Sequence, residues 1–226
     1  MPHRRRQRNR CSVEGLSVVT WRWGNKYPGH YVERLKAALT RNIDQEFKFC
    51  VFCPEEEDEY LTKIPGCFCR LRMFDPEWQQ KHGLTGRIVC VDLDLIVTGK
   101  LDELFDRPEK FVILQGANAS NPCPYNGSVM MLRAGARPDV WNDFSLKRAA
   151  EVPFYEFPDD QGWLAHKIPN AGAWNAGAES GVYAFQKPGW PKGDALPKGA
   201  RIVAFPGWRD PSSFTHLDWV KKNWAA

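Results

Sequence analysis

The chain has 226 residues, of which 43% are hydrophobic, and this is enough for one domain with a sizeable core. No uninterrupted apolar run approaches 18 residues, so the sequence predicts no transmembrane helix. The formal net charge is +4, but the arginines among residues 1–10 exceed it, and the remaining chain is close to neutral. This balance disfavours a nucleic-acid-binding protein.

Residues 1–12 are predicted to form a basic, disordered tail in front of a single domain over residues 13–226. Clustered arginines attract anionic lipid headgroups, so peripheral membrane contact through this tail is an expectation. No apolar segment typical of a secretory signal follows the arginines, and the sequence therefore predicts a cytoplasmic location.

The first sixty residues predict a strand, a loop, a helix and a second strand. The strand Leu16–Trp21 leads into a loop at 24–29 that is rich in turn formers. Apolar residues between Tyr31 and Leu39 then recur at helical spacing, and Phe47–Phe52 is the next strand. This order is typical of a parallel sheet. Neither a G-x-G-x-x-G nor a G-x-x-x-x-G-K-[ST] motif is present, which disfavours a dinucleotide oxidoreductase and a P-loop NTPase.

The stretch 85–105 carries the strongest chemical signal. Its apolar run Ile88–Val91 predicts a buried strand, at the end of which Asp92 and Asp94 follow. Buried carboxylates must be protonated, paired or metal-bound. On an extended chain residues two apart point the same way, and two hard oxygen ligands suit Mg²⁺ or Mn²⁺. The alternative is that these carboxylates cap the following turn.

Ligands of parallel sheets bind beyond the carboxyl ends of the strands. The Lys26–Tyr27 loop and the two aspartates are therefore expected to lie at one rim of the sheet.

The second half of the chain is less regular. The predicted elements are a strand at 111–114, a polar loop at 116–125, an apolar run at 129–132 after Asn126-Gly127-Ser128, a helix at 141–150, loops around a cleft at 169–200, and a last strand at 201–205. Asp159 or Asp160 could cap a helix that follows them.

Four of the seven cysteines, Cys50, Cys53, Cys67 and Cys69, are spaced so that they could hold a structural zinc ion. The other interpretation is that they are buried, reduced thiols.

Read together, the motifs resemble one enzyme family. In order they are W-G-N-K-Y with Y-V-x-x-L, V-D-L-D at a strand end, G-x-L-D-E-L, N-G-S before an apolar run, and D-D-Q. This order is similar to that of the bacterial branch of glycosyltransferase family 8, and the resemblance covers about 16–224. It implies an α/β fold: a single GT-A-type, Rossmann-like domain with a mixed, mostly parallel sheet flanked by helices. It also implies a retaining, metal-dependent glycosyltransferase.

The resemblance implies roles for individual residues. Asp92 and Asp94 would hold Mn²⁺ or Mg²⁺ on the diphosphate of a nucleotide-sugar donor, with Asp92 also near the ribose. Lys26 and Tyr27 would lie by the nucleotide and Asn126 by the donor sugar. The catalytic residues would be Asp160 and Gln161, near the anomeric carbon. The implied partners are this donor and a carbohydrate or glycoconjugate acceptor.

The chain departs from the family near its C-terminus. The family completes its metal site with a histidine in a pattern like H-x-x-G-x-x-K-P-W, whereas the stretch 203–211 here keeps Gly207 without the histidine or the K-P-W. His216 is a nearby but out-of-register candidate for the third ligand. Arg209 could supply positive charge to the diphosphate instead.

The chemistry of glycosyl transfer agrees with these residues independently of the resemblance. A divalent ion neutralises charge on a diphosphate leaving group, and a carboxylate or amide can stabilise an oxocarbenium-like transition state. Aromatic faces stack on sugar C–H groups, for which Trp163, Trp174, Trp190 and Trp208 are candidates, although packing is the favoured role of each one taken singly.

Two other functions compete with sugar transfer. A haloacid-dehalogenase-type phosphohydrolase also places D-x-D at a strand end, with Asp159-Asp160 as its downstream acidic pair. Its signature calls for Thr or Val where this chain has Ile96, and it usually lies on the first strand. A non-catalytic protein that binds a sugar or nucleotide is the third reading, since the family histidine is missing.

Overall fold

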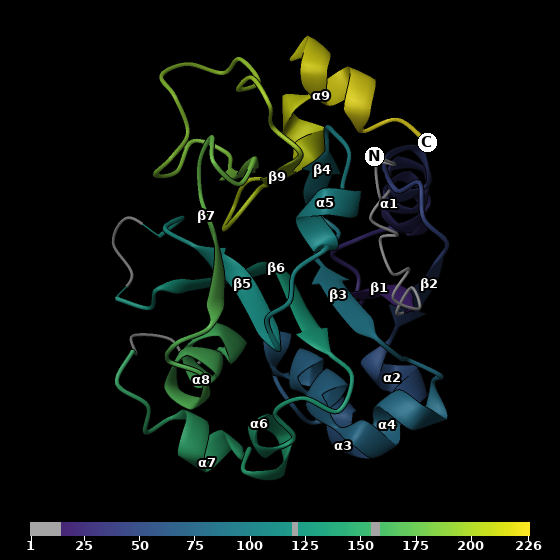
Figure 1. Cartoon of the computed structure of the whole chain (residues 1–226), viewed down its shortest axis with the longest axis vertical. Helices are drawn as coiled ribbons and strands as arrows, with labels where there is room; N and C mark the ends of the chain where they lie inside the picture. Colours follow the sequence, from purple (N-terminus) through teal and green to yellow (C-terminus); the bar gives the residue numbers. More distant parts are fainter. Residues whose placement is uncertain (1–14, 119–121, 155–158) are drawn as a thin grey trace, which may run out of the picture.

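The computed structural model describes residues 15–118, 122–154 and 159–226, and its centre is an α/β sheet (Figure 1). The strands are β1 (Leu16–Trp21), β2 (Phe47–Phe52), β3 (Arg87–Val91), β4 (Leu95–Val97), β5 (Phe111–Gln115), β6 (Tyr125–Arg133), β7 (Gly172–Asn175), β8 (Val182–Ala184) and β9 (Ile202–Ala204). The predicted basic tail at 1–12 lies outside the described residues.

Short helices connect most of the strands. They are α1 (Gly29–Asn42), α2 (Pro54–Glu57), α3 (Glu59–Thr62), α4 (Pro76–Lys81), α5 (Asp102–Phe105), α6 (Asp139–Asn142), α7 (Leu146–Ala149), α8 (Asp160–Lys167) and α9 (Asp218–Asn223), with 3₁₀ helices η1 (Gly66–Phe74) and η2 (Pro211–Phe214). Within the described ranges, no helix combines the length and apolar character that crossing a bilayer requires.

In the described part of the chain the main sheet has six strands in the order β2-β1-β3-β6-β5-β7, and β6 alone runs against the others. The pair β1 and β2 is parallel, with α1 between them along the chain, and Leu16 lies opposite Phe47. The predicted strands 16–21 and 47–52 and the mostly parallel sheet are thus confirmed.

Both faces of the main sheet are covered at β3, which is buried along its whole length and apolar after Arg87. On one face Val89 and Val91 belong to a core with α1, α5 and the small second sheet. On the other face Ile88 and Cys90 belong to a core with η1, α4, α6 and α8. The strand that precedes the aspartates is therefore held rigidly from both sides.

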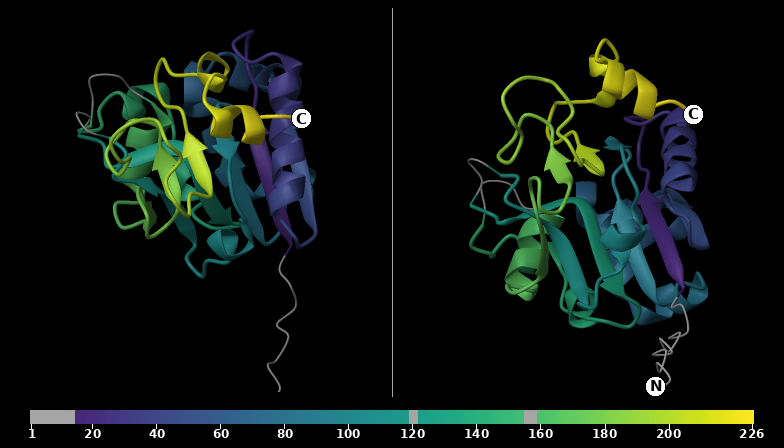
Figure 2. Two further views of the ribbon diagram at one scale, coloured as in Figure 1. Left: turned by 90° about the horizontal axis from the view of Figure 1, so that it is seen from above. Right: turned by 45° about the horizontal axis from the view of Figure 1, so that its top comes forward.

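The second sheet of the described residues contains three strands in the order β4-β9-β8. It lies toward the same end of the molecule as α9 (Figure 1). The C-terminal segment is tied to α1: the Arg34 guanidinium lies 3.9 Å from the Trp224 ring centroid, and Arg41 donates to the Ala225 carbonyl at 3.1 Å. Both views of Figure 2 show α9 beside α1.

Three predictions about local structure were wrong. The helix expected at 141–150 is two short helices, because the Ser145 side chain accepts a hydrogen bond from the Arg148 amide and starts α7 anew. Asn126-Gly127-Ser128 lies inside β6 rather than before it. The segment 169–200 contains β7 and β8 in addition to loops.

Candidate functional site

A cleft of about 210 Å³ lies at the carboxyl ends of β1 and β3. It receives residues from the loop after β1, from η1, from the segment between β3 and β4, and from the starts of β6 and α8. It is lined by Trp21, Trp23, Lys26, Tyr27, Cys67, Arg70, Asp92, Leu93, Asp94, Asn126, Gly127, Ser128, Gln161, Pro206 and Gly207. The structure therefore brings six of the proposed site residues together: Lys26, Tyr27, Asp92, Asp94, Asn126 and Gln161.

Asp92 and Asp94 lie in a turn between the two sheets and not on an extended chain. The Asp92 amide donates to the Ser128 carbonyl at 3.0 Å, which ties the turn to β6. The Asp94 carbonyl accepts from the Phe205 amide at 3.1 Å, which ties it to the end of β9. The prediction that an extended chain would point the two carboxylates the same way was therefore wrong. Both carboxylates nevertheless line the same cleft.

Asp94 is 8% exposed and has two partners. The Tyr27 hydroxyl donates to Oδ2, and the Lys26 ammonium lies 3.6 Å from the same oxygen. Burial and the neighbouring Asp92 charge raise the pKa of Asp94 to about 6, although Tyr27 and Lys26 act in the opposite direction. Burial and Asp94 raise the pKa of Tyr27 as well, so this hydroxyl remains a donor at neutral pH.

Arg70 is the main functional residue that the sequence reasoning missed. Its guanidinium is buried and donates to both Asp160 oxygens at 2.9 and 3.0 Å, to Asp92, and to the Gly127 carbonyl at 2.9 Å. Burial lowers the pKa of Arg70, but Asp160 and Asp92 outweigh burial and hold this pKa well above its ordinary value. The available signal was an arginine within the otherwise apolar run around Cys67–Leu71, where a charge needs a partner.

Gly127 leaves the space that this guanidinium occupies. A Cβ atom at Gly127 would lie 2.5 Å from Arg70 Nη2 and 3.4 Å from Gln161 Cγ. The Arg70 side chain cannot swing away cheaply, since its hydrogen bonds fix it. The glycine of the N-G-S segment is therefore required by the close approach of β6 to Arg70.

Asp159 and Asp160 have different positions at the start of α8. Asp159 is the N-cap, accepting from the Gly162 amide at 3.2 Å, as one of the sequence readings expected. Asp160 is fully buried behind the cleft and reaches it only through Arg70. Burial raises the pKa of Asp160 to about 6 even though Arg70 lowers it, so the carboxyl is ionised at neutral pH.

Gln161 lies in the cleft with its side chain fixed at both ends. Its Oε1 accepts from the Gly127 amide at 3.0 Å, and its Nε2 donates to Asp159 at 2.6 Å. Asn126 is oriented in a similar way, because its Oδ1 accepts from the Ser128 amide at 3.0 Å. Two amide side chains are therefore presented beside the carboxylates in defined orientations.

Besides the buried Asp160, two of the proposed site residues lie outside the cleft lining. Arg209 follows the lining residues Pro206 and Gly207, and its Nε donates to Gln186 at 3.3 Å. His216 is exposed, with its ring centroid 6.1 Å from that of Phe214.

The cleft offers an incomplete metal site. Among the described residues, no group of three or more His, Cys, Asp or Glu side chains is arranged to hold a metal ion. The described cysteines are free thiols, and burial raises the pKa of Cys67 to about 12, so this cleft thiol is not a ready nucleophile. Asp92 and Asp94 do provide hard oxygen atoms whose mutual repulsion a divalent cation would relieve. This donor set fits Mg²⁺ or Mn²⁺ that receives its other ligands from a diphosphate and water.

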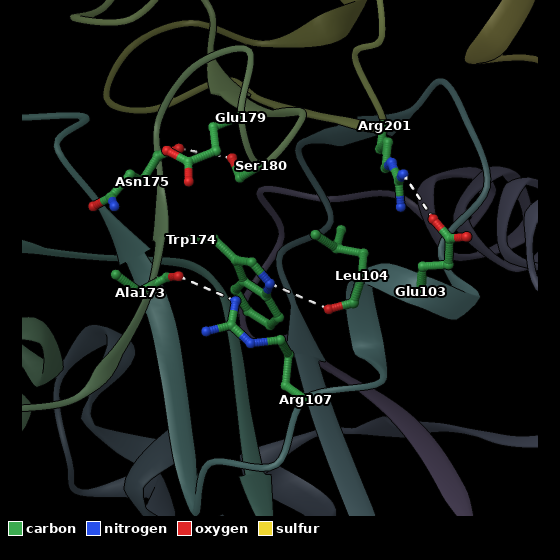
Figure 3. Close-up of a pocket in the computed structure, with 9 residues that line it drawn as sticks. All are labelled: Glu103, Leu104, Arg107, Ala173, Trp174, Asn175, Glu179, Ser180 and Arg201. Carbon is green, nitrogen blue, oxygen red and sulfur yellow. Dashed lines mark hydrogen bonds and ion pairs between the residues drawn. The ribbon is translucent and has the colours of Figure 1, made fainter.

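A second and larger pocket, of about 300 Å³, lies between α5 and the edge strand β7 (Figure 3). Its two arginines have partners: Arg201 pairs with Glu103 at 3.1 Å, and Arg107 donates to the Ala173 carbonyl at 3.3 Å. The Trp174 indole at its base is buried and donates to the Leu104 carbonyl. None of the proposed catalytic, donor-binding or metal residues lines this pocket, and the smaller cleft is therefore the candidate site.

No protein-family model and no curated protein matches the sequence. Solved structures of glycosyltransferases do match the fold. The galactosyltransferase LgtC, in complex with donor and acceptor sugar analogues, is 13% identical; the match covers 93% of this chain and 97% of that chain, with a TM-score of 0.55. GlyE of Streptococcus pneumoniae TIGR4 is 14% identical, with 92% of this chain and 63% of that chain covered and a TM-score of 0.59.

A third structure is a glycosyltransferase involved in the glycosylation of the major capsid of PBCV-1. It is 14% identical, the match covers 90% of this chain and 98% of that chain, and the TM-score is 0.53. Likeness at such low identity bears on the fold alone, and it agrees with the fold that the sequence motifs imply. The chain has the GT-A fold of glycosyltransferases.

Proposed function

We propose that the protein is a glycosyltransferase that moves a sugar from a nucleotide-diphosphate sugar to a carbohydrate or glycoconjugate acceptor, with retention and with Mn²⁺ or Mg²⁺ as cofactor. The observation that carries the proposal is the cleft at the carboxyl end of the parallel strands. Two carboxylates, a lysine and two fixed amides meet there on a GT-A scaffold. Ligands of open α/β sheets bind at this edge.

The chain would bind the donor through groups of opposite charge. Asp92 and Asp94 would hold the cation, and Lys26, 3.6 Å from Asp94, would face the diphosphate. When bound, the divalent ion would neutralise the charge that develops on the leaving diphosphate. Arg70 keeps Asp92 oriented from behind, so this carboxylate is positioned before the ligand arrives.

The fixed amide of Gln161 suits the sugar end of the cleft. Charge develops at the anomeric carbon as the bond to the diphosphate breaks, and an amide oxygen held close to it stabilises an oxocarbenium-like transition state. Gln161 needs no reorganisation for this role because Gly127 and Asp159 already hold it. Asp160, which is buried and bonded to Arg70, would act through Arg70 and not by touching the sugar.

Two other functions, phosphate-ester hydrolysis and sugar-nucleotide binding without turnover, compete with sugar transfer. A phosphohydrolase of the haloacid-dehalogenase type has less support, because the three matching structures described above are glycosyltransferases. A protein that binds sugar nucleotides without turnover would share the same cleft, and turnover separates it from an enzyme.

The test is a thermal-shift screen of nucleoside diphosphates and sugar nucleotides, with and without Mn²⁺. A ligand at 100 times its Kd stabilises the native state by about 2.7 kcal/mol. For a chain of this size the Tm should rise by about 5–10 °C. We expect one donor to produce this shift with Mn²⁺ and to be turned over, with release of nucleoside diphosphate. A thermal shift without turnover would favour a protein that binds the sugar nucleotide without transfer. Release of phosphate from simple phosphoesters would favour the phosphohydrolase.

Replacement of Gln161 tests its proposed role in the transition state. We expect Gln161→Ala to lower kcat by about 10- to 100-fold and to leave donor affinity within a few fold. Steady-state kinetics with the donor from the screen, together with its thermal shift, measure both quantities. Gln161→Glu tests the two contacts separately, since it keeps the acceptor for the Gly127 amide but loses the donor to Asp159. An unchanged kcat in Gln161→Ala would restrict the residue to fixing the start of α8.

A further inference from the structure

The four tryptophans that could stack on a sugar are not equally available. Trp163 and Trp174 are 2% and 1% exposed, and each indole donates to a backbone carbonyl in the core. Trp190 packs against Phe185 with ring centroids 5.0 Å apart. Trp208 is 80% exposed, more than any other large hydrophobic side chain in the described ranges.

Trp208 lies at the rim of the candidate site. The two residues before it, Pro206 and Gly207, line the cleft, and Trp208 follows them directly in the chain without being part of the lining. Gly207 turns the chain here with φ +78°, and no atom lies within 4 Å of the position that a Cβ would occupy. The Phe205 amide is bonded to the Asp94 carbonyl, so the segment that carries Trp208 is anchored to the D-x-D turn.

One neighbouring residue lies over the Trp208 ring, and the side chain nevertheless stays largely exposed. The Arg209 guanidinium lies 4.9 Å from the Trp208 ring centroid, and its Nε donates to Gln186 at 3.3 Å. Gln186 in turn donates to Asp194 at 2.8 Å. This chain of contacts links the loop after β9 to the loop after β8, and the ring still remains open to solvent.

A single exposed apolar side chain is ordinary, so exposure alone indicates nothing. The combination here is more specific: an open aromatic face, a cationic neighbour, and a position immediately outside a polar cleft. A pyranose ring has the complementary surface, with C–H groups on one face and hydroxyls around its edge, and tryptophan offers a large area of contact at low conformational cost.

We infer that Trp208 is the platform on which the acceptor carbohydrate lies as it enters the cleft. The inference rests on the proposed transferase function and assigns the entrance of that site. The acceptor and not the donor is the occupant, because the groups that suit a diphosphate, Asp92, Asp94 and Lys26, line the interior of the cleft. Arg209 would add hydrogen bonds to the hydroxyls at the edge of the sugar.

The test measures binding of simple pyranosides by saturation-transfer difference NMR. The probes are the methyl glycosides of glucose, galactose, mannose and N-acetylglucosamine, titrated with the protein in the presence of the nucleoside diphosphate and Mn²⁺. We expect saturation on the ring C–H protons of at least one probe. Trp208→Ala should weaken that probe about tenfold, whereas Trp208→Phe, which keeps an aromatic face, should stay within about threefold.

Tyr60→Ala is the matched control, because Tyr60 is a half-exposed aromatic residue that is absent from the lining of the cleft. It should leave glycoside binding unchanged. The nucleoside-diphosphate thermal shift should be the same in all variants. Glycoside binding in Trp208→Ala equal to wild type, or no glycoside binding by the wild type, would overturn the inference. A lost nucleotide shift in Trp208→Ala would also overturn it, because Trp208 would then belong to the donor.

The two proposals fail in different ways. If no sugar nucleotide is bound or turned over, the transferase function fails whatever the glycoside titration shows. If donor binding and turnover are normal but Trp208→Ala binds the glycosides as tightly as the wild type, only the assignment of Trp208 as the acceptor platform fails.

Discussion

Arg70→Met is expected to destabilise the protein by about 3–5 kcal/mol at pH 8, because it leaves the buried Asp160 carboxylate without its partner. Methionine fills much of the volume of the arginine side chain, so most of the loss reflects charge and hydrogen bonds. Urea denaturation at pH 5.5 and pH 8, for wild type and variant, measures the effect and its dependence on pH.

The pH dependence follows from the raised pKa of Asp160. A carboxyl whose pKa is higher in the folded state stabilises the fold at low pH and loses that contribution as pH rises through the folded pKa. In the wild type the loss ends near the folded pKa of about 6. Without Arg70 the folded pKa is higher still, so the loss continues to higher pH. The difference between wild type and variant should therefore be smaller at pH 5.5 than at pH 8.

The double variant Arg70→Met/Asp160→Leu is the control for this reasoning. A buried ion pair replaced by apolar residues of similar volume is often close to neutral, so the double variant should recover most of the lost stability. It should nevertheless lack transferase activity, because Asp92 loses the donor that orients it. If Arg70→Met loses the same free energy of unfolding at both pH values, and the double variant does not recover it, the loss would be due to packing and not to the buried charge.

Elements with strong local patterns were predicted well from the sequence. The strands at 16–21 and 47–52 have the predicted bounds, because turn formers or polar residues delimit a short apolar run in each case. The D-x-D position was also predictable, since a buried parallel strand must deliver its following residues to the ligand-binding edge. These inferences depend on a single segment and its immediate neighbours.

Features that depend on contacts far apart in the sequence were not predictable in this way. Nothing in 92–97 indicates that the chain leaves the main sheet there, because Leu95–Val97 is as apolar as Ile88–Val91. The pairing of Leu95–Val97 with Ile202–Ala204 places this strand in the second sheet. Arg70 is 90 residues from Asp160 and 22 from Asp92. Nothing in this spacing indicates that Arg70 donates hydrogen bonds to both carboxylates. The break between α6 and α7 required the Ser145 cap to be weighed against a continuous helical pattern.

Asp94→Asn is expected to remove the dependence of nucleotide binding on metal while leaving the fold intact. The amide keeps an acceptor for the Tyr27 hydroxyl but is a poor ligand for Mn²⁺. A bound cation contributes several kcal/mol to the transition state, so transfer should fall by at least about 100-fold. Asp218→Asn, which removes an exposed carboxylate in α9, should change neither quantity.

The stability of ligand-free Asp94→Asn should differ little from that of wild type at pH 8. The pKa of Asp94 is raised to about 6 by burial and by Asp92, which means that its charge is unfavourable to the fold above that pH. The substitution removes this cost together with an ion pair to the largely exposed Lys26, and such pairs contribute little. A marked loss of ligand-free stability at pH 8 would make Asp94 a structural residue, at odds with a site that tolerates unfavourable charge to bind a cation.

Calorimetric titration of Mn²⁺ shows whether two protein carboxylates are the whole metal site. An ion that prefers six ligands should bind the free protein weakly and bind tightly with the nucleoside diphosphate, and each ligand should strengthen the other by the same factor. His216→Ala should not alter this coupling, since His216 is exposed and outside the cleft lining. Tight Mn²⁺ binding to the free protein that disappears in His216→Ala would mean that the C-terminal segment moves to bring a histidine ligand into the site.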